Sequence, residues 1–559
     1  MTQPKKIAII GAGPSGLTAI KSCKEEGFLP VCFERNGDPG GLWRYHDEDI
    51  EGVASVMKTT IINTSKELSA FSDFPPPKEY PNFMHNSKMF DYFMLYAETF
   101  NLLRHIRYHL EVTKVEPSKD YDTNGRWIVT LKSTQTEAIS REEFDGVMIC
   151  IGHHVYPNIP TFPGQQKFKG TILHTHSVKS CERFSDQKVV VVGIGNSGVD
   201  AAVDCGFVAK QVYLSTRRGS WIMSRVGDNG KPYDLDFTSR KNMILEKFIS
   251  YETKSKLFEQ KLDEKFDHAA YNLKPKHRFF SAHPTLNDAL PNCILSGRVI
   301  VKGDIDRFEE NGVVFAGENT VTKVDAVVLA TGYKIQFPFL DSSVVSTKDN
   351  RIHLYKYAIP PNLKYHNLAF IGLVQPLGPI FPVAEMHCRW FAQILSGKLK
   401  LPSIKQMLKD IECKNKGNEK RYVASTRHTI QVDWIPFMDE LSSMFGAKPS
   451  LLKLAITDPR LFWACLNGPC LPYQYRLQGP HTWPGARDAI LTCEERVYAP
   501  LNSSGIKPCQ QKESFFSRKK VLLLLTVSAV SVMYGRKYFE KSFNLEGFNF
   551  SSNVFSLKF

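Results

Sequence analysis

Short apolar runs that end in glycine-rich loops are the most regular hydrophobic pattern along the chain. Residues 7–10 read IAII and precede GAGPSG at 11–16, and residues 189–192 read VVVV and precede GIGNSG at 193–198. A helical pattern follows each loop. A buried strand, a tight glycine turn and a helix, in this order, are typical of the first unit of a doubly wound sheet. We therefore predict an α/β chain with two doubly wound, Rossmann-like dinucleotide-binding domains.

Two further apolar runs indicate where the chain passes between these domains. Residues 145–152 read DGVMICIG and residues 324–333 read VDAVVLATGY, and each ends with a glycine where the backbone must pass close to a cofactor. The predicted division of the chain is residues 1–155 and 331–445 for the first domain, 156–330 for the second domain with a helical insertion near 220–295, and 446–513 for a C-terminal helical region.

The far C-terminal part carries a different pattern. Residues 521–534 read VLLLLTVSAVSVMY, with RKK at 518–520 before them and RK at 536–537 after them. As a helix this run would reach about 21 Å, against about 30 Å of bilayer hydrocarbon. A buried core helix is the alternative, but basic flanks favour a membrane anchor. We predict a membrane-anchoring tail over 514–559, which either spans the bilayer or lies in its interface.

The composition is ordinary for a globular protein, but the charge and the cysteines narrow the choice of partners. Hydrophobic residues make up 42% and charged residues 23% of the 559, and 71 Lys plus Arg against 57 Asp plus Glu give a formal charge of +14. This excess suits anionic lipid, a phosphate-rich cofactor or a generally basic surface; no basic-aromatic pattern supports nucleic acid. The 12 cysteines form no C-x-x-C pair. We therefore expect no metal site and no disulfide framework, but reduced thiols in a cytosol-facing protein.

The first glycine loop has the residues of a dinucleotide site. Gly11 permits the tight turn, Gly13 lets the backbone approach a pyrophosphate, and Gly16 lets the helix pack against the strand. A second apolar run, 29–33, ends at Glu34, where a carboxylate would accept hydrogen bonds from a ribose diol. The run GGLWR that follows looks like a second diphosphate contact, so the predicted FAD-binding residues are Gly11, Gly13, Ser15, Gly16, Glu34, Gly41, Leu42 and Trp43.

The second glycine loop differs from the first at the position of the acid. The next apolar run ends in STRR, so Arg217 and Arg218 stand where an acid would bind a free 2′-hydroxyl. A guanidinium matches a 2′-phosphate in charge and geometry, which predicts NADPH rather than NADH. Arginines that are merely exposed are the alternative. The predicted NADPH-binding residues are Gly193, Gly195, Asn196, Ser197, Gly198, Thr216, Arg217 and Arg218.

These loops and three further stretches closely resemble the flavin-containing monooxygenases of vertebrates. The three stretches are FKGTILHTHSV at 168–178, NTSKE at 63–67 and GLVQPLG at 372–378. Residues 217–221 and 274–288 look most like the family member that oxygenates ketones. The chain departs from the family at Val178, where relatives have Tyr or Phe, and in the residues that continue beyond the apolar tail. Losing that aromatic side chain either has no effect or loosens the closed complex with NADP.

The resemblance implies the chemistry of the family. NADPH would reduce FAD, the reduced flavin would form a hydroperoxide with molecular oxygen, and bound NADP would stabilise this hydroperoxide until an amine nitrogen or a sulfide sulfur attacks it. Baeyer–Villiger oxygenation of ketones and an uncoupled NADPH oxidase that releases hydrogen peroxide are the enzymatic alternatives. A flavoprotein scaffold or redox sensor is the non-enzymatic one.

The resemblance also implies roles for individual residues and a location. Asn63 is assigned as the catalytic hydrogen-bond donor, because an amide donates without titrating. Asn63, Thr64 and Gln375 are expected at the cofactors, and His283 is a weaker candidate for ketone chemistry. We expect the protein to be located at the endoplasmic reticulum membrane, with membrane lipid as a partner and the catalytic part facing the cytosol. The oligomeric state is not predicted.

Overall fold

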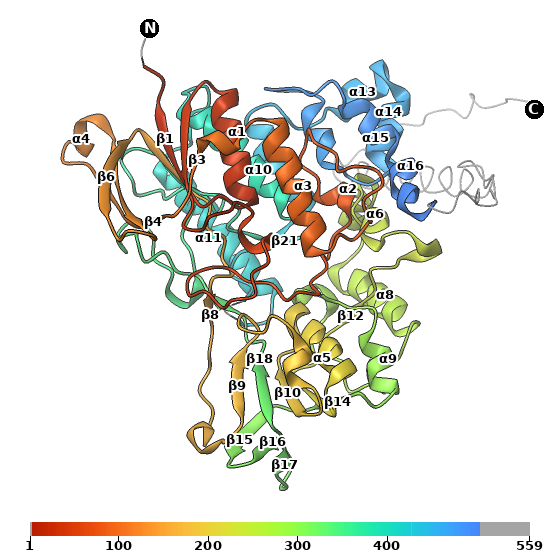
Figure 1. Cartoon of the computed structure of the whole chain (residues 1–559). Helices are drawn as coiled ribbons and strands as arrows, with labels where there is room; N and C mark the ends of the chain where they lie inside the picture. The colour runs from red at the N-terminus through yellow and green to blue at the C-terminus, as the bar shows by residue number, and fades with distance from the viewer. Residues whose placement is uncertain (1–2, 426, 503–559) are drawn as a thin grey trace, which may run out of the picture. The chain divides into compact units, whose positions relative to one another are not determined.

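The computed structural model describes residues 3–425 and 427–502, and residues up to Pro500 belong to one compact unit. Figure 1 shows its helices and strands. None of the helices in these described ranges is long and apolar enough to cross a membrane. The predicted anchoring tail, including residues 521–534, lies outside the described residues.

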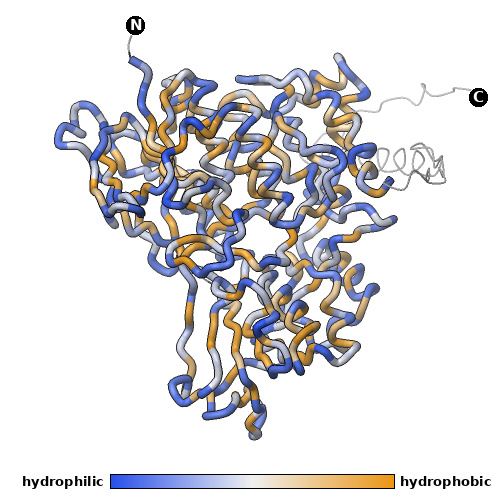
Figure 2. Tube along the Cα trace, in the orientation of Figure 1, coloured by the Kyte–Doolittle hydropathy of each residue, from blue (hydrophilic) through white to orange (hydrophobic). Residues whose placement is uncertain are grey.

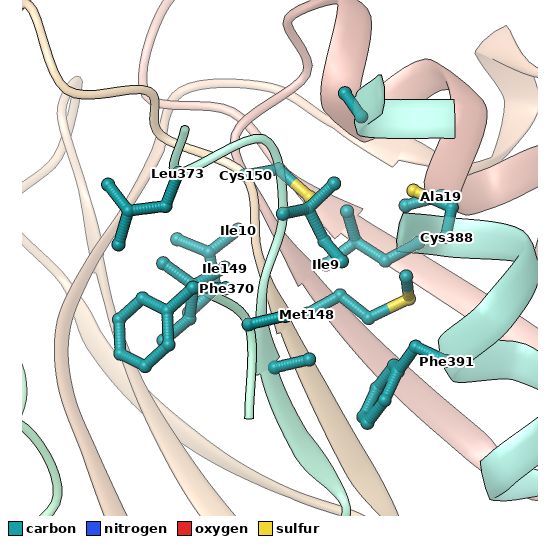
Figure 3. Packing of buried hydrophobic residues seen from close by; sticks show 14 of the residues in the cluster. Ile9, Ile10, Ala19, Met148, Ile149, Cys150, Phe370, Leu373, Cys388 and Phe391 are labelled. Atoms are coloured by element: carbon teal, nitrogen blue, oxygen red, sulfur yellow. The ribbon is translucent and has the colours of Figure 1, made fainter. Parts of the chain in front are cut away.

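A five-stranded parallel sheet forms the core of the N-terminal part. Its strands, in spatial order, are β20 (Leu368–Phe370), β7 (Gly146–Ile149), β1 (Lys6–Ile10), β2 (Leu29–Phe33) and β3 (Ile106–Arg107). Helices α1 (Pro14–Glu25) and α10 (Phe381–Leu395) pack against each other beside this sheet, where Met148 lies close to Cys388 and Phe391 (Figure 3). Because both faces of the sheet are covered, its strands are apolar without alternation.

A second five-stranded parallel sheet contains the strand that leads into the second glycine loop. Its order is β14 (Val299–Lys302), β11 (Gln211–Ser215), β10 (Lys188–Val192), β18 (Ala326–Leu329) and β9 (Thr171–His174). Val189 and Val191 face α5 (Asn196–Val208), whereas Val190 and Val192 face the antiparallel strands β15 (Ile305–Glu309), β16 (Gly312–Phe315) and β17 (Thr322–Lys323). Apart from Lys188, the residues of β10 and β18 are apolar, and the part of the tube that these strands occupy is largely orange in Figure 2. The predicted α/β fold is confirmed by these two parallel sheets.

The two connections between the sheets pair with each other. Strand β8 (Tyr156–Pro157) lies in the first connection and β19 (Tyr333–Lys334) in the second, and the two are antiparallel. His174 of the family stretch supports this crossing, because its Nε2 lies 3.0 Å from the Gly332 carbonyl oxygen. The proposed boundaries of the cofactor domains fall in these connections and stay a prediction.

The insertion after β11 has its own small core. It contains β12 (Ile222–Met223), α6 (Tyr233–Phe237), α7 (Arg240–Leu245), α8 (Tyr251–Asp263), β13 (Thr285–Leu286) and α9 (Leu290–Leu295). Trp221, Met223, Phe279, Phe280 and Leu286 pack together there. Helices α7 and α8 lie within the region near 220–295 where a helical insertion is expected, and a short 3-10 turn at Glu246–Phe248 follows α7.

The remaining helices and strands complete the unit. They are α2 (Lys66–Ser69), α3 (Asn86–Thr99), α4 (Tyr121–Asn124), the antiparallel β4 (Leu110–Pro117), β5 (Trp127–Ser133) and β6 (Ile139–Phe144), the pair β21 (Gln375–Leu377) and β22 (Gln431–Asp433), α11 (Ile404–Arg421), α12 (Trp434–Met444), α13 (Leu451–Thr457), α14 (Pro459–Asn467), α15 (Ala486–Leu491) and α16 (Cys493–Tyr498).

Two fully buried cations connect the first and last parts of this unit. The Lys66 ammonium donates hydrogen bonds to the carbonyl oxygens of Lys78, Tyr80 and Arg496 at 2.7, 2.8 and 2.9 Å. Its burial lowers the pKa of Lys66 to about 8. The Arg476 guanidinium forms ion pairs with Asp73 and Glu385, both at 2.9 Å. Removing one member of such a cluster would leave an uncompensated buried charge, which is strongly destabilising.

Candidate active site

Both glycine loops line one large cavity of about 1160 Å³. The following sequence-predicted site residues line it: Gly11, Gly13, Ser15, Glu34, Gly41, Leu42, Trp43, Asn63, Thr64, Gly193, Gly195, Asn196, Ser197, Gly198, Thr216, Arg217, Arg218 and Gln375. Gly16 does not line it but lies under the first loop. A Cβ atom on Gly16 would stand 2.0 Å from the Gly11 carbonyl oxygen, so only glycine fits there.

The first loop leaves room for a ligand beside its backbone. Gly11 has a φ of +94°, and its amide donates to the Phe33 carbonyl oxygen at 2.8 Å, which turns the chain between β1 and α1. A Cβ atom on Gly41 would lie 3.1 Å from the Gly13 Cα. The two glycines therefore form a narrow backbone cradle that side chains would fill, as a diphosphate group requires.

Glu34 is held rigidly at the tip of β2. Its two carboxylate oxygens accept hydrogen bonds from the backbone amides of Ala12 and Asn36, at 2.9 and 3.0 Å. Burial raises the pKa of Glu34, and these amide donors act against the rise. The carboxylate thus faces the first loop as a fixed acceptor, and with the glycine cradle it fits the ribose and diphosphate of a dinucleotide.

The second loop repeats this geometry, but two arginines follow its neighbouring strand β11 where an acid follows β2. Gly193 has a φ of +115°, and its amide donates to the Ser215 carbonyl oxygen at 3.0 Å. A Cβ atom on Gly198 would lie 2.0 Å from the Gly193 carbonyl oxygen. Arg217 and Arg218 are exposed at the cavity, and within residues 3–425 and 427–502 neither forms an ion pair. Both guanidiniums are therefore available to a phosphate.

Asn63 contacts the insertion through both its side chain and its backbone. The Asn63 Oδ1 accepts a hydrogen bond from Arg225 Nη2 at 2.7 Å, and the Asn63 carbonyl oxygen accepts one from the Tyr233 hydroxyl at 3.3 Å. Asp288 holds Arg225 in turn, with its Oδ1 accepting the Arg225 backbone amide at 2.9 Å. Because the guanidinium can only donate, it fixes the amide oxygen on its own side. The Asn63 Nδ2 has no partner among the described residues and remains a donor.

Two other predicted residues are placed by contacts that the sequence did not indicate. Asn196 Oδ1 accepts the Leu286 backbone amide at 2.9 Å, so this side chain is bound to the insertion. The Gln375 backbone amide donates to the Ile430 carbonyl oxygen at 2.8 Å, which joins β21 to the segment after α11. Both residues line the cavity.

Burial shifts the pKa values of several titratable groups around the cavity. Burial raises the pKa of Asp234 to about 6, against hydrogen bonds such as the 2.6 Å bond from the Ser65 amide to its Oδ2. Burial, with Arg427 nearby, lowers the pKa of His283 to about 3 and that of His154 to about 4. At neutral pH these histidines are uncharged, and arginines supply the positive charge of the cavity.

Several cavity residues were missed or left unassigned by sequence reasoning. Tyr233 and Asp234 come from the insertion, and Arg427 follows α11. Their positions depend on contacts between distant segments, so no local pattern identifies them. His283 does line the cavity, with its Nδ1 at 3.1 Å from Gln431 Nε2. Val178, in contrast, is fully buried in the core of the second sheet and does not line the cavity.

The chain is similar to known proteins over most of its length. The family model for flavin-binding monooxygenase-like proteins matches residues 4–535. The chain is 47% identical to flavin-containing monooxygenase 5 of Homo sapiens, over 95% of this chain and 99% of that protein. It is 41% identical to dimethylaniline monooxygenase [N-oxide-forming] 2 of Cavia porcellus, over 95% and 99%. The fold is also similar to S-allyl-L-cysteine S-oxygenase from Allium sativum, with a TM-score of 0.60, 24% identity, and coverage of 79% and 89%. The chain therefore belongs to the flavin-containing monooxygenases, a family of FAD- and NADPH-dependent enzymes.

Proposed function

We propose that this enzyme uses NADPH and molecular oxygen to oxygenate soft nucleophiles, namely amine nitrogen and sulfide sulfur. One observation carries the proposal: a single cavity is lined by the first glycine loop with Glu34, by the second glycine loop with Arg217 and Arg218, and by Asn63. A hydride donor and a flavin bound at these loops would share one space with a substrate. The dimethylaniline monooxygenase among the relatives is named for forming an N-oxide.

Each loop would hold one cofactor. The cradle of Gly13 and Gly41, with Glu34 as the ribose acceptor, suits FAD. The second loop suits NADPH, with Arg217 and Arg218 facing the 2′-phosphate. In this assignment residues 1–155 and 331–445 bind FAD and residues 156–330 bind NADPH.

The chain's own contribution to the reaction is binding, orientation and exclusion of water. When bound, the FAD–NADPH pair supplies the chemistry that reduces dioxygen and transfers one of its oxygen atoms to the substrate. Asn63 would donate a hydrogen bond from Nδ2 toward the reacting oxygen, while Arg225 holds its Oδ1 at 2.7 Å. Apolar side chains such as Phe279, Phe280 and Leu377 line the same cavity and would keep water from the reacting atoms.

The stoichiometry of the FAD-loaded enzyme tests the proposal. The enzyme is supplied with NADPH, oxygen and either a tertiary amine, a thioether or an aliphatic ketone, and NADPH consumption, oxygenated product and hydrogen peroxide are quantified. We expect about one N-oxide or S-oxide per NADPH. Ester formation from the ketone alone would show Baeyer–Villiger oxygenation instead. Hydrogen peroxide equal to NADPH with every substrate would show an oxidase and refute the proposal.

We further propose that the enzyme is bound to the endoplasmic reticulum membrane with the cavity facing the cytosol. The apolar run 521–534 and its basic flanks support this location. The test compares the full chain with the Leu523→Lys variant in cell fractions washed with alkaline carbonate. The unmodified chain should stay with the membranes and the variant should be released. Equal release of both would contradict the anchor.

A further inference from the structure

An arginine whose guanidinium has no hydrogen-bond or ion-pair partner among the described residues lies against the second glycine loop. The Arg427 guanidinium sits so close to Gly195 that a Cβ atom there would lie 2.8 Å from Nη1 and 3.2 Å from Cζ. Across the part of the chain that the structure describes, this guanidinium forms no ion pair and no hydrogen bond. Arg427 also lines the cavity. A cation that faces a cavity without a counter-ion is prepared for an anionic ligand.

The segment that carries Arg427 is held in place from two sides. We name residues 422–425 and 427–431 the strap. The Val423 amide donates to the Ser281 carbonyl oxygen at 2.9 Å, and the His283 amide donates to His428 Nε2 at 3.4 Å, which joins the strap to the insertion. The Gln375 amide donates to the Ile430 carbonyl oxygen at 2.8 Å, which joins the strap to β21. The strap that carries Arg427 is therefore joined to both the insertion and β21.

The groups that surround Arg427 do not compensate its charge. Its titratable neighbours are His154, His283 and His428, whose pKa values are lowered to about 4, 3 and 4, mainly by burial. All three are neutral at pH 7. Arg218 also lies near His428 and adds further positive charge to this side of the cavity. The local excess of positive charge thus comes from arginines that no described carboxylate pairs with.

We propose that Arg427 binds the pyrophosphate of NADPH and of the NADP product. In this loop type the second glycine, here Gly195, is the one at which the backbone approaches the pyrophosphate. A guanidinium stacked on that glycine is within reach of the same phosphates, and its fork of donors matches two phosphate oxygens. The inference rests on the proposed binding of NADPH at the second loop. It adds a nucleotide-binding residue from the strap, which lies outside the predicted NADPH domain.

The experiment measures nucleotide affinity rather than turnover. The FAD-loaded full chain and its Arg427→Gln variant are titrated calorimetrically with NADP and with NAD, which share the pyrophosphate and differ in the 2′-phosphate. We expect both affinities to fall by about 10–100-fold, the effect of losing a charge-assisted bidentate contact. Arg217→Ala should weaken NADP alone. Arg460→Gln, at an exposed position on α14 that does not line the cavity, should change neither affinity.

Each other result has a distinct meaning. Unchanged affinities in Arg427→Gln would overturn the proposal, and a loss confined to NADP would assign Arg427 to the 2′-phosphate and also overturn it. The melting temperature of the variant without nucleotide should equal that of the parent, because the guanidinium forms no hydrogen bond or ion pair with the described residues. A lowered melting temperature together with weaker binding would indicate a structural role and refute the assignment. Failure of the parent enzyme to bind NADP would instead refute the proposed function at the second loop.

Discussion

The bond between Arg225 and Asn63 gives the sharpest prediction about catalysis. Replacing Arg225 with Met keeps most of the side-chain volume but removes the donor that holds the Asn63 amide oxygen at 2.7 Å. The amide can then turn, and in the proposed role of Asn63 its NH2 group would lose its fixed orientation toward the reacting oxygen. We therefore expect Arg225→Met to lower kcat/KM for oxygenation and to raise the fraction of NADPH that yields hydrogen peroxide.

The size of the effect follows from the two contacts that Arg225 makes. A charge-assisted hydrogen bond in a partly buried place contributes about 1.5–3 kcal/mol, which corresponds to about 10–150-fold in rate. The ion pair with Asp288 contributes less than about 1 kcal/mol, because the Asp288 side chain is 41% exposed and screened by solvent. Most of the loss should therefore come from the contact with Asn63.

A double-mutant cycle with Asn63→Ala measures this coupling directly. Arg225→Met should cost about 10–150-fold in the parent enzyme and less than about 3-fold in the Asn63→Ala background, because Arg225 would act through Asn63. Arg225→Lys should recover part of the rate, and Asp288→Asn should change it only slightly. Equal losses in both backgrounds would show that Arg225 acts independently of Asn63 and would refute the reasoning.

Three further predictions concern stability and cofactor choice. Gly198→Ala should prevent folding of the second sheet and yield little soluble protein, because its Cβ would lie 2.0 Å from the Gly193 carbonyl oxygen. In the control Gly206→Ala, in the same helix, the new Cβ meets its nearest neighbour at 3.5 Å, so this variant should raise the melting temperature slightly. Equal yields of the two variants would contradict this prediction. Burial raises the pKa of Asp234 to about 6 in the folded state, so its contribution to stability is greatest below about pH 4 and is lost as pH rises through 6. Asp234→Asn keeps an acceptor for Ser65 and should stabilise the protein above pH 6 by up to about 3 kcal/mol, as denaturant unfolding at pH 4 and pH 8 would show, and an unchanged pH dependence would count against it. The Arg217→Ala/Arg218→Ala variant should lower the preference of kcat/KM for NADPH over NADH by about 10–100-fold, and a preserved preference would remove these arginines from the 2′-phosphate site.

The sequence predicted those features whose physics is local. A buried strand, a glycine turn and a helix are encoded within about 30 residues, so both loops could be located from their pattern. Glu34 and Arg217 stand at strand ends fixed by the same unit. Gly16 differs from the other loop glycines because it does not line the cavity. Glycine is required there because a side chain would collide with the Gly11 carbonyl oxygen.

The contacts that complete the cavity could not be predicted, because they join segments far apart in the chain. Arg225 reaches Asn63 across 162 positions, and the strap with Arg427 meets Gly195 from beyond α11. The effect of Val178 on the complex with NADP stays a prediction. Its side chain is fully buried in the core of the second sheet. Val178→Tyr would overpack that core, which typically costs about 1–3 kcal/mol.

The buried ammonium of Lys66 has a consequence for biosynthesis. One of its three acceptors is the carbonyl oxygen of Arg496, which is 430 positions further along the chain. At about 5–20 residues per second, a ribosome needs about 20–90 s to make that distance. The second sheet, by contrast, comes from the single stretch 171–329 and can close earlier. A nascent chain therefore carries an incomplete N-terminal core for most of its synthesis, and it is during this interval that chaperones would protect it.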